Sequence, residues 1–260
     1  GQRLIHDLVL THAIQGPGFA YFRDAVLSVQ PMISLIKRDE QIGFYIDSED
    51  PYFRLKIETG HDGDVRCVLI PEQFREFPAA MHGFVRVLKL FPFDRPPYES
   101  VIRADGLALR DIVNRVLRDS YQVHCATLVS ERSDQSAMLH QLPPLPGRDD
   151  YDFSIDAVRV RRDRIRDEIQ GVFGRGLTDG SEIQAAFAAI GWRCIGDRTI
   201  QLRCSCSRER MVDNVRLVYT REGDTLFDPG QNVLEIVCEY CKARYLIARK
   251  ELHGGSADPH

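Results

Sequence analysis

The sequence contains no apolar run of about 18 residues and no N-terminal series of charged, apolar and small residues. Neither a membrane span nor a secretory signal is therefore expected. A broad basic field is also missing, because 38 acidic and 34 basic residues are distributed through the chain. We expect no membrane and no nucleic-acid partner, and a reducing cytoplasm as the location. The chain starts Gly1-Gln2 without a methionine, which leaves a processed N-terminus and an organelle address open.

The chain has 260 residues, of which 43% are hydrophobic, as in an ordinary folded protein. No internal repeat is visible, and the stretch "PPLPGRDDYD" at 143–152 indicates a boundary. We predict an α+β fold in three parts: an N-terminal domain of antiparallel sheet and helix, a helical linker region, and a small C-terminal domain that contains four closely spaced cysteines, typical of a zinc-binding domain. Their predicted ranges are 1–145, 146–197 and 198–260.

In the N-terminal part, "FRLKIETGHDGDVRCVL" alternates apolar and polar residues on both sides of a glycine-containing turn. This pattern predicts a β-hairpin over 52–70. Helical material at 18–36 must be interrupted or delimited by Pro31. The other expected elements are strands at 42–46, 84–91 and 121–130, a proline-rich turn at 92–97 and a helix within 106–119.

The linker is highly charged, since 13 of the 21 residues at 148–168 are Arg, Asp or Glu. A helix remains possible because apolar residues recur near one face, although the stripe is narrow and its docking is expected to be weak. A second helix is predicted to start at Ser181, with Gln184 completing a capping box, and to end at Gly191. The residues of the apolar stripe are Ile155, Val158, Ile165, Ile169 and Val172.

Four of the seven cysteines form two close pairs, Cys204 with Cys206 and Cys238 with Cys241. Zinc prefers four ligands in a tetrahedron, and two such pairs in one small segment are typical of a zinc site. Two other interpretations remain: small buried hydrophobic residues, or a dithiol of the thioredoxin kind. The nearest histidine, His253, lies outside the pairs and is not expected to be a ligand.

Arginine and lysine flank both pairs, where they would offset the net charge of −2 that four thiolates leave around Zn²⁺. Solvated surface charges or a small nucleic-acid-binding patch are the alternatives, and interleaved glutamates weaken the second. The remaining cysteines are expected to be packing residues rather than reactive ones. They are Cys67 and Cys125, core thiols of predicted strands, and Cys194 beside Trp192, for which partial accessibility is left open.

The stretches "CSCSRER" and "LEIVCEYCKARYLI" resemble the redox-sensing tail of the heat shock protein 33 family of redox-regulated chaperones. The resemblance extends to 46–70, 98–130 and 136–143, which are similar to strands and a helix of that family's N-terminal domain. Members of the family often have a glycine after the last cysteine, because the turn there needs a permissive backbone. In this sequence Lys242 occupies that position.

This resemblance implies a chaperone, not an enzyme, that zinc holds inactive through Cys204, Cys206, Cys238 and Cys241. Oxidation would release zinc and form the disulfides Cys204–Cys206 and Cys238–Cys241. Tail and linker would then unfold, a homodimer would be favoured, and unfolding client proteins would be held without ATP.

Two other functions are weighed against the chaperone. One is a zinc-ribbon protein that binds nucleic acid, and the other is a thiol-disulfide oxidoreductase that uses Cys238 and Cys241. The missing basic stripe disfavours the first, and the additional Cys-x-Cys pair disfavours the second. The predicted client surface is the linker face with the sheet beneath it, although permanent packing of the same side chains is equally compatible with the pattern. Its residues are Ile155, Val158, Ile165, Ile169 and Phe173.

Overall fold

The computed structural model describes residues 1–72, 78–92, 95–147 and 152–253. The chain divides into two compact units, Gly1–Leu202 and Arg203–His260. In the part of the chain that is described, no helix combines the length and the apolar character that crossing a membrane requires.

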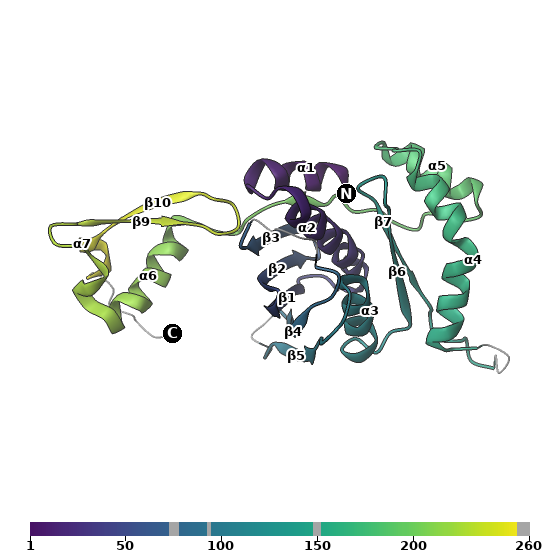
Figure 1. The fold of residues 1–260 in the computed structure, drawn as a ribbon, viewed down its shortest axis with the longest axis horizontal. Coiled ribbons are helices and arrows are strands. Elements are labelled where there is room, and N and C mark those ends of the chain that lie inside the picture. Colours follow the sequence, from purple (N-terminus) through teal and green to yellow (C-terminus); the bar gives the residue numbers. More distant parts are fainter. Residues whose placement is uncertain (73–77, 93–94, 148–151, 254–260) are drawn as a thin grey trace. The chain divides into compact units, whose positions relative to one another are not determined.

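The first unit is built on a six-stranded sheet with the strand order β5-β4-β1-β2-β3-β8 (Figure 1). Neighbouring strands are antiparallel except for β8, which runs parallel to β3. This confirms the predicted α+β domain with an antiparallel sheet. The strands are β1 (Gln41–Asp50), β2 (Tyr52–Gly60), β3 (Asp64–Ile70), β4 (His82–Leu90), β5 (Tyr98–Arg103) and β8 (Gln201–Leu202).

The predicted hairpin over 52–70 is confirmed by the pairing of β2 with β3. Phe53, Leu55 and Ile57 alternate on the buried face, as the period of two requires. The turn passes through Gly63, whose φ is +88°. A side chain there would also collide with the backbone carbonyl of Thr199, which lies against the turn. Glycine is thus needed at position 63, where the segment that leads into β8 passes against the turn of the hairpin.

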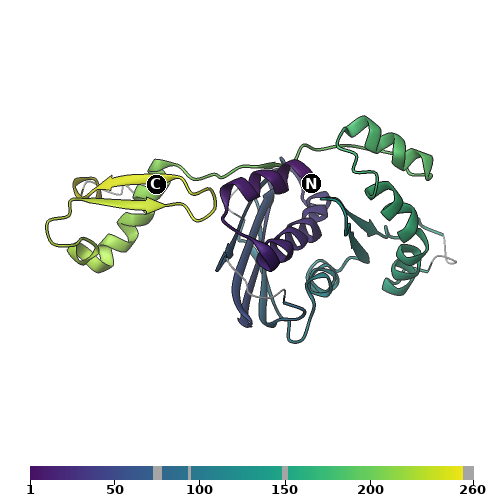
Figure 2. The ribbon, with the colours of Figure 1, turned by 45° about the horizontal axis from the view of Figure 1, so that its top comes forward.

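Three helices cover one face of this sheet (Figures 1 and 2). They are α1 (Gln2–Thr11), α2 (Gly16–Val29) and α3 (Leu109–Asp119). The helix α2 gives way to a 3₁₀ turn, η1 (Gln30–Leu35), which confirms the expected interruption at Pro31. Tyr21, Phe22 and Phe44 are among the largest fully buried side chains, so the core lies between these helices and the sheet.

Most remaining elements of this domain were predicted with small errors at their ends. The strand expected at 42–46 continues to Asp50, and the helix expected in 106–119 begins at Leu109. The strand expected at 121–130 is β6 (Cys125–Val129). Of the turn predicted at 92–97, residues 93–94 lie outside the described residues.

A two-stranded sheet of β6 and β7 (Ser136–His140) follows, and the helix α4 (Ile155–Phe173) packs against it. Ser154 caps α4 by accepting a hydrogen bond from the Ala157 amide. The helix predicted at Ser181 is α5 (Gly180–Ala189), and its cap was predicted wrongly. Asp179 is the cap, since its carboxylate accepts from the amides of Ser181 and Glu182. A carboxylate at this position binds the free amides more strongly than a hydroxyl, which explains the shift.

In its described residues, 203–253, the second unit has a helix, a hairpin and two short turns of helix. Its elements are α6 (Arg208–Glu222), η2 (Gly223–Leu226), β9 (Val233–Val237), β10 (Arg244–Ala248) and α7 (Arg249–Leu252). Its buried apolar side chains are Val212, Val215, Phe227, Ile247 and Leu252. The predicted division into three parts stays a prediction; Gln201 and Leu202, placed in the third part, pair with β3 in the first unit.

Candidate metal centre

The first cysteine pair lies in the extended segment that precedes α6. Cys204 and Cys206 are followed directly by Ser207, which caps α6 and accepts a hydrogen bond from the Arg210 amide at 3.3 Å. A helix N-terminus carries a partial positive charge. The fold therefore places the first cysteine pair in the residues that lead directly into the N-terminus of α6.

The second pair lies in the turn that joins β9 to β10. The Cys238 amide donates to the Ala243 carbonyl at 2.9 Å, and the Lys242 amide donates to the Cys238 carbonyl at 2.8 Å. These bonds bend the chain so that Cys238 and Cys241 present their sulfurs on the same side. Lys242 has φ +60°, so the position after the last cysteine does require the left-handed conformation that glycine adopts most easily.

The four sulfur atoms of Cys204, Cys206, Cys238 and Cys241 all lie within 4.8 Å of one another. Two of the separations are 3.7 Å, between Cys204 and Cys238, and 3.3 Å, between Cys206 and Cys241. A tetrahedral zinc site with Zn–S bonds of about 2.3 Å requires sulfur separations of about 3.8 Å. The sulfur cluster therefore has the donor type, number and size that zinc requires.

The surroundings of the sulfur cluster are partly apolar. Cys238 is buried, and the other three cysteines are half-buried. Burial raises the pKa of the Cys241 thiol to about 12, with hydrogen bonds from the neighbouring Cys206 and Cys238 sulfurs adding to the effect. Zinc binds the thiolate form of cysteine, so metal binding at Cys241 would release its proton.

Two of the flanking arginines, Arg208 and Arg210, bind oxygen atoms near the sulfur cluster. Arg210 donates to the Ser205 carbonyl at 2.7 Å, which fixes the bend between the first two cysteines. Arg208 forms an ion pair with Glu251 at 2.8 Å and donates to the Leu246 carbonyl at 3.1 Å. These side chains therefore shape the loops that carry the cysteines, a role that their position in the sequence did not reveal.

The other candidate ligands lie elsewhere. Cys67 and Cys125 are buried as predicted, and burial raises the pKa of each thiol. Cys194 was predicted to pack, and this was wrong: it is exposed. It lies in a stretch after α5 without regular structure, where the nearest polar partner is the Gly196 carbonyl at 3.4 Å. His253 is outside the sulfur cluster and contacts the Tyr219 hydroxyl.

The predicted client face is covered in this structure. Val158, Ile165, Ile169 and Phe173 are buried, and Ile155 is half-buried. Ile165, Ile169 and Phe173 form a cluster with Leu128 of β6, joined by partly buried residues of β7 and α5. The apolar stripe of α4 thus packs on the sheet of β6 and β7.

The sequence of elements in both units has a counterpart among solved structures. The crystal structure of the 33 kDa chaperonin from Thermotoga maritima superposes with a TM-score of 0.66 over 97% of this chain and 89% of that chain, at 16% sequence identity. This likeness defines the fold class. The family model described as Hsp33 protein matches residues 1–248, and the chain belongs to this family.

Curated relatives support the same assignment. A 33 kDa chaperonin of Geobacter sp. is 23% identical over 85% of this chain and 78% of its own length. The 33 kDa chaperonin of Pseudomonas fluorescens is 21% identical over 95% of this chain and 84% of its own length. That of Prochlorococcus marinus is 22% identical over 97% of this chain and 94% of its own length. The resemblance inferred from the cysteine motifs is confirmed, and a chaperone function is supported.

Proposed function

We propose that this chain is a redox-regulated, ATP-independent chaperone that zinc keeps inactive in the reduced state. The observation that carries the proposal is the meeting of four sulfur atoms from two distant segments of the second unit. Cys204, Cys206, Cys238 and Cys241 would hold the zinc ion, which would supply a fixed junction between the start of α6 and the β9–β10 turn. The proposed site is closed, since all four ligands come from the protein, as in structural zinc sites.

The proposed switch depends on how little else holds the second unit together. Its core has five buried apolar side chains, and units of this size are marginal without a metal or disulfides. A structural zinc ion contributes on the order of 10 kcal/mol. Loss of zinc is therefore expected to unfold the residues from 203 onward.

Oxidation provides the route to that loss. For each disulfide, two thiolates give two electrons to one molecule of peroxide, which takes up two protons and leaves as two molecules of water. We propose the pairs Cys204–Cys206 and Cys238–Cys241. The sulfur contacts at 3.7 and 3.3 Å join one cysteine of each pair to one of the other, so forming the proposed disulfides separates the two segments. A Cys-x-Cys disulfide closes a tight ring and is readily reduced, which suits a reversible switch.

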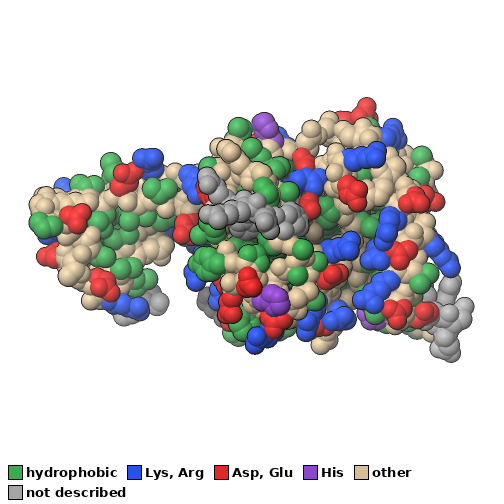
Figure 3. All heavy atoms as spheres, in the orientation of Figure 1, with side chains coloured by type: hydrophobic (Ala, Val, Ile, Leu, Met, Phe, Trp, Pro, Cys, Tyr) green, Lys and Arg blue, Asp and Glu red, His purple; other side chains and the backbone are tan. Residues whose placement is uncertain are grey.

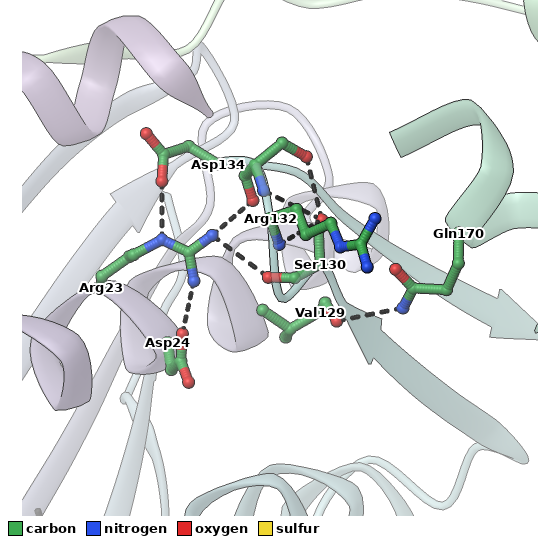
Figure 4. A network of polar contacts seen from close by, with 8 residues as sticks. Arg23, Asp24, Val129, Ser130, Arg132, Asp134 and Gln170 are labelled. Atoms are coloured by element: carbon green, nitrogen blue, oxygen red, sulfur yellow. Dashed lines mark hydrogen bonds and ion pairs between the residues drawn. The ribbon is translucent and has the colours of Figure 1, made fainter. Parts of the chain in front are cut away.

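The surface that the switch releases is proposed to be the buried stripe of α4 and the sheet of β6 and β7 beneath it. The ion pairs described for α4 are within the helix, as between Arg166 and Asp163 at 2.7 Å. Charges of both signs alternate over its outer side (Figure 3). Among the described residues, the hydrogen bond that joins α4 to the rest of the unit is an uncharged one, in which Gln170 donates to the Val129 carbonyl at 3.3 Å (Figure 4). We therefore expect α4 to detach from β6 and β7 when the second unit unfolds.

The sheet of β6 and β7 beneath α4 is held by more polar contacts. Arg23 donates to the carbonyls of Ser130 and Ser133 and to the carboxylates of Asp24 and Asp134 (Figure 4). The loop that joins β6 to β7 is therefore tied to α2. We propose that this sheet stays folded when α4 leaves, and that Leu128 and Leu139 become available to clients.

The remaining parts of the proposal follow from the same scheme. The partners would be unfolding or aggregation-prone proteins and, after oxidation, a second copy of the chain. The location would be the cytoplasm, where reducing conditions keep the switch closed until oxidative stress. No enzymatic activity, nucleic-acid binding or membrane binding is proposed.

The test is to treat zinc-loaded protein with peroxide at elevated temperature and to follow zinc release, disulfide formation and the aggregation of a thermally unfolding client. We expect suppression of aggregation to appear together with zinc release and to reverse on adding a thiol reductant. If zinc leaves and both disulfides form while aggregation proceeds unchanged, the chaperone proposal fails.

A further inference from the structure

A tyrosine hydroxyl contacts the metal centre directly. The Tyr245 hydroxyl lies 3.0 Å from the Cys206 sulfur, although the two residues are 39 positions apart in the chain. A thiolate can only accept a hydrogen bond, so the phenol donates whenever Cys206 is deprotonated. We propose that Tyr245 is a positioning residue of the metal centre, which orients the Cys206 thiolate and protects it from oxidants. This inference rests on the proposed zinc site.

The hydroxyl is held in place by the strand that carries it. Tyr245 is the second residue of β10 and pairs with Ile236 of β9. The next residue, Leu246, accepts a hydrogen bond from Arg208 at the start of α6. Tyr245 and Cys206 are therefore both anchored near the N-terminus of α6. This anchoring holds the tyrosine hydroxyl near the Cys206 sulfur.

The contact distinguishes the sulfurs of the first pair. The contact described for the Cys204 sulfur is the Cys238 sulfur at 3.7 Å, whereas Cys206 combines a sulfur contact at 3.3 Å with the phenol. Both cysteines are half-buried, so access alone does not separate them. The predicted difference in their chemistry comes from the hydrogen bond.

A donated hydrogen bond withdraws electron density from sulfur. Attack on peroxide forms a sulfur–oxygen bond and breaks the oxygen–oxygen bond, which converts the thiolate to sulfenic acid and releases hydroxide. The hydrogen bond from the phenol engages one lone pair of the Cys206 sulfur and makes the remaining lone pairs less nucleophilic. The same bond stabilises a negatively charged metal–thiolate cluster, as partners of metal ligands generally do. Tyr245 would thus raise the zinc affinity and direct first oxidation to another cysteine.

The direct test is Tyr245→Phe, which removes the hydroxyl and keeps the ring. Tyr219→Phe is the matched control, because the Tyr219 hydroxyl lies in the same unit and contacts Asp224 at 2.8 Å instead of a sulfur. Zinc affinity is measured by competition with a chromogenic chelator, and Co²⁺ is substituted to record the sulfur-to-metal charge-transfer band. We expect Tyr245→Phe to bind zinc about 10-fold more weakly and to shift the band, with Tyr219→Phe unchanged.

A second measurement uses the unmodified chain and does not depend on the variant folding. Limited peroxide treatment in the presence of a sulfenic-acid trapping reagent, followed by mass spectrometry, should find the trapped sulfenic acid on Cys204 before it appears on Cys206 in the wild type. In Tyr245→Phe this delay should disappear. Equal trapping at the two cysteines in the wild type, or an unchanged affinity and Co²⁺ band in the variant, would overturn the assignment of Tyr245. A wild-type chain that binds no zinc would instead refute the proposed metal site.

Discussion

The two units of the chain obtain their stability from different sources. The first has a continuous core of 32 buried residues, built from a sheet and the helices that cover one face of it. The second has five, together with four cysteines whose sulfurs meet at one point. Burial of apolar surface stabilises the first unit, whereas under the proposed function the second unit also depends on metal-binding thiols that an oxidant can change. The proposal therefore expects the chain to lose the second unit and to keep the first.

Between these extremes lies the contact of α4 with β6 and β7. Four buried apolar residues, Leu128, Ile165, Ile169 and Phe173, form its centre. They belong to the first unit but are separate from its main core.

The largest effect is expected from removing a sulfur ligand. Cys238→Ser replaces the buried member of the sulfur cluster, so zinc affinity should collapse and the residues from 203 onward should unfold in reductant. The predicted loss is on the order of 10 kcal/mol of metal-linked stability, and limited proteolysis should remove the second unit while leaving residues 1–145 intact. Cys194→Ser is the control, since Cys194 is exposed and outside the sulfur cluster. Retained zinc stoichiometry and protease resistance in Cys238→Ser would contradict the ligand assignment.

A smaller effect is expected at the intermediate contact. Phe173→Ala removes a side chain that is 2% exposed and should destabilise the docking of α4 by about 3–4 kcal/mol. Hydrogen exchange should speed up over 155–173 and leave the six-stranded sheet unchanged. Val160→Ala, on the exposed side of α4, is the matched control. If Phe173→Ala exposes α4 without increasing client binding in the reduced protein, the proposed client surface is wrong.

A still smaller effect, of opposite sign, is expected at the turn after the last cysteine. Lys242 has φ +60°, where a residue with a Cβ atom is strained, so Lys242→Gly should stabilise the zinc-bound unit by about 1 kcal/mol. Lys242→Val should destabilise it, because a β-branched residue tolerates this conformation poorly. Thermal unfolding of the zinc-loaded protein measures both, and equal shifts in the two variants would show that backbone strain is not the cause.

The smallest effect is expected at the start of α5. Asp179→Ala removes the carboxylate that accepts from the amides of Ser181 and Glu182. Amide exchange in the first turn of α5 should rise by about fivefold, without a change in zinc affinity. Ser181→Ala should have less effect, since Ser181 is not the cap. A larger effect from Ser181→Ala than from Asp179→Ala would instead support the capping box at Ser181 that the sequence pattern predicted.

The sequence predicted the regular elements well where the period was clear. Alternating residues such as Phe53, Leu55 and Ile57 identified the hairpin because one face of each strand is buried. The ends of helices were harder to predict, as Asp179 shows, because neighbouring polar residues compete for the same free amides. The cysteine pairs predicted one metal site because two closely spaced pairs within a small segment are typical of zinc binding, and this spacing can be read directly from the sequence.

The finer surroundings of that site could not be predicted in the same way. Tyr245 reaches Cys206 only through the pairing of β10 with β9, and Arg210 reaches Ser205 only through the first turn of α6. Cys194 was expected to pack because cysteine is usually a buried residue, but it is exposed, as is its neighbour Trp192. Composition around a residue does not determine burial when the segment has no regular structure.

The central claim is that oxidation unfolds the second unit and releases α4 while the main sheet remains. Hydrogen exchange with mass spectrometry, before and after peroxide, measures this directly for each segment. The predicted result is loss of protection in 203–253 and 155–173, with protection retained in the strands from 41 to 103. Protection that stays unchanged in 155–173 after complete zinc release and disulfide formation would contradict the account.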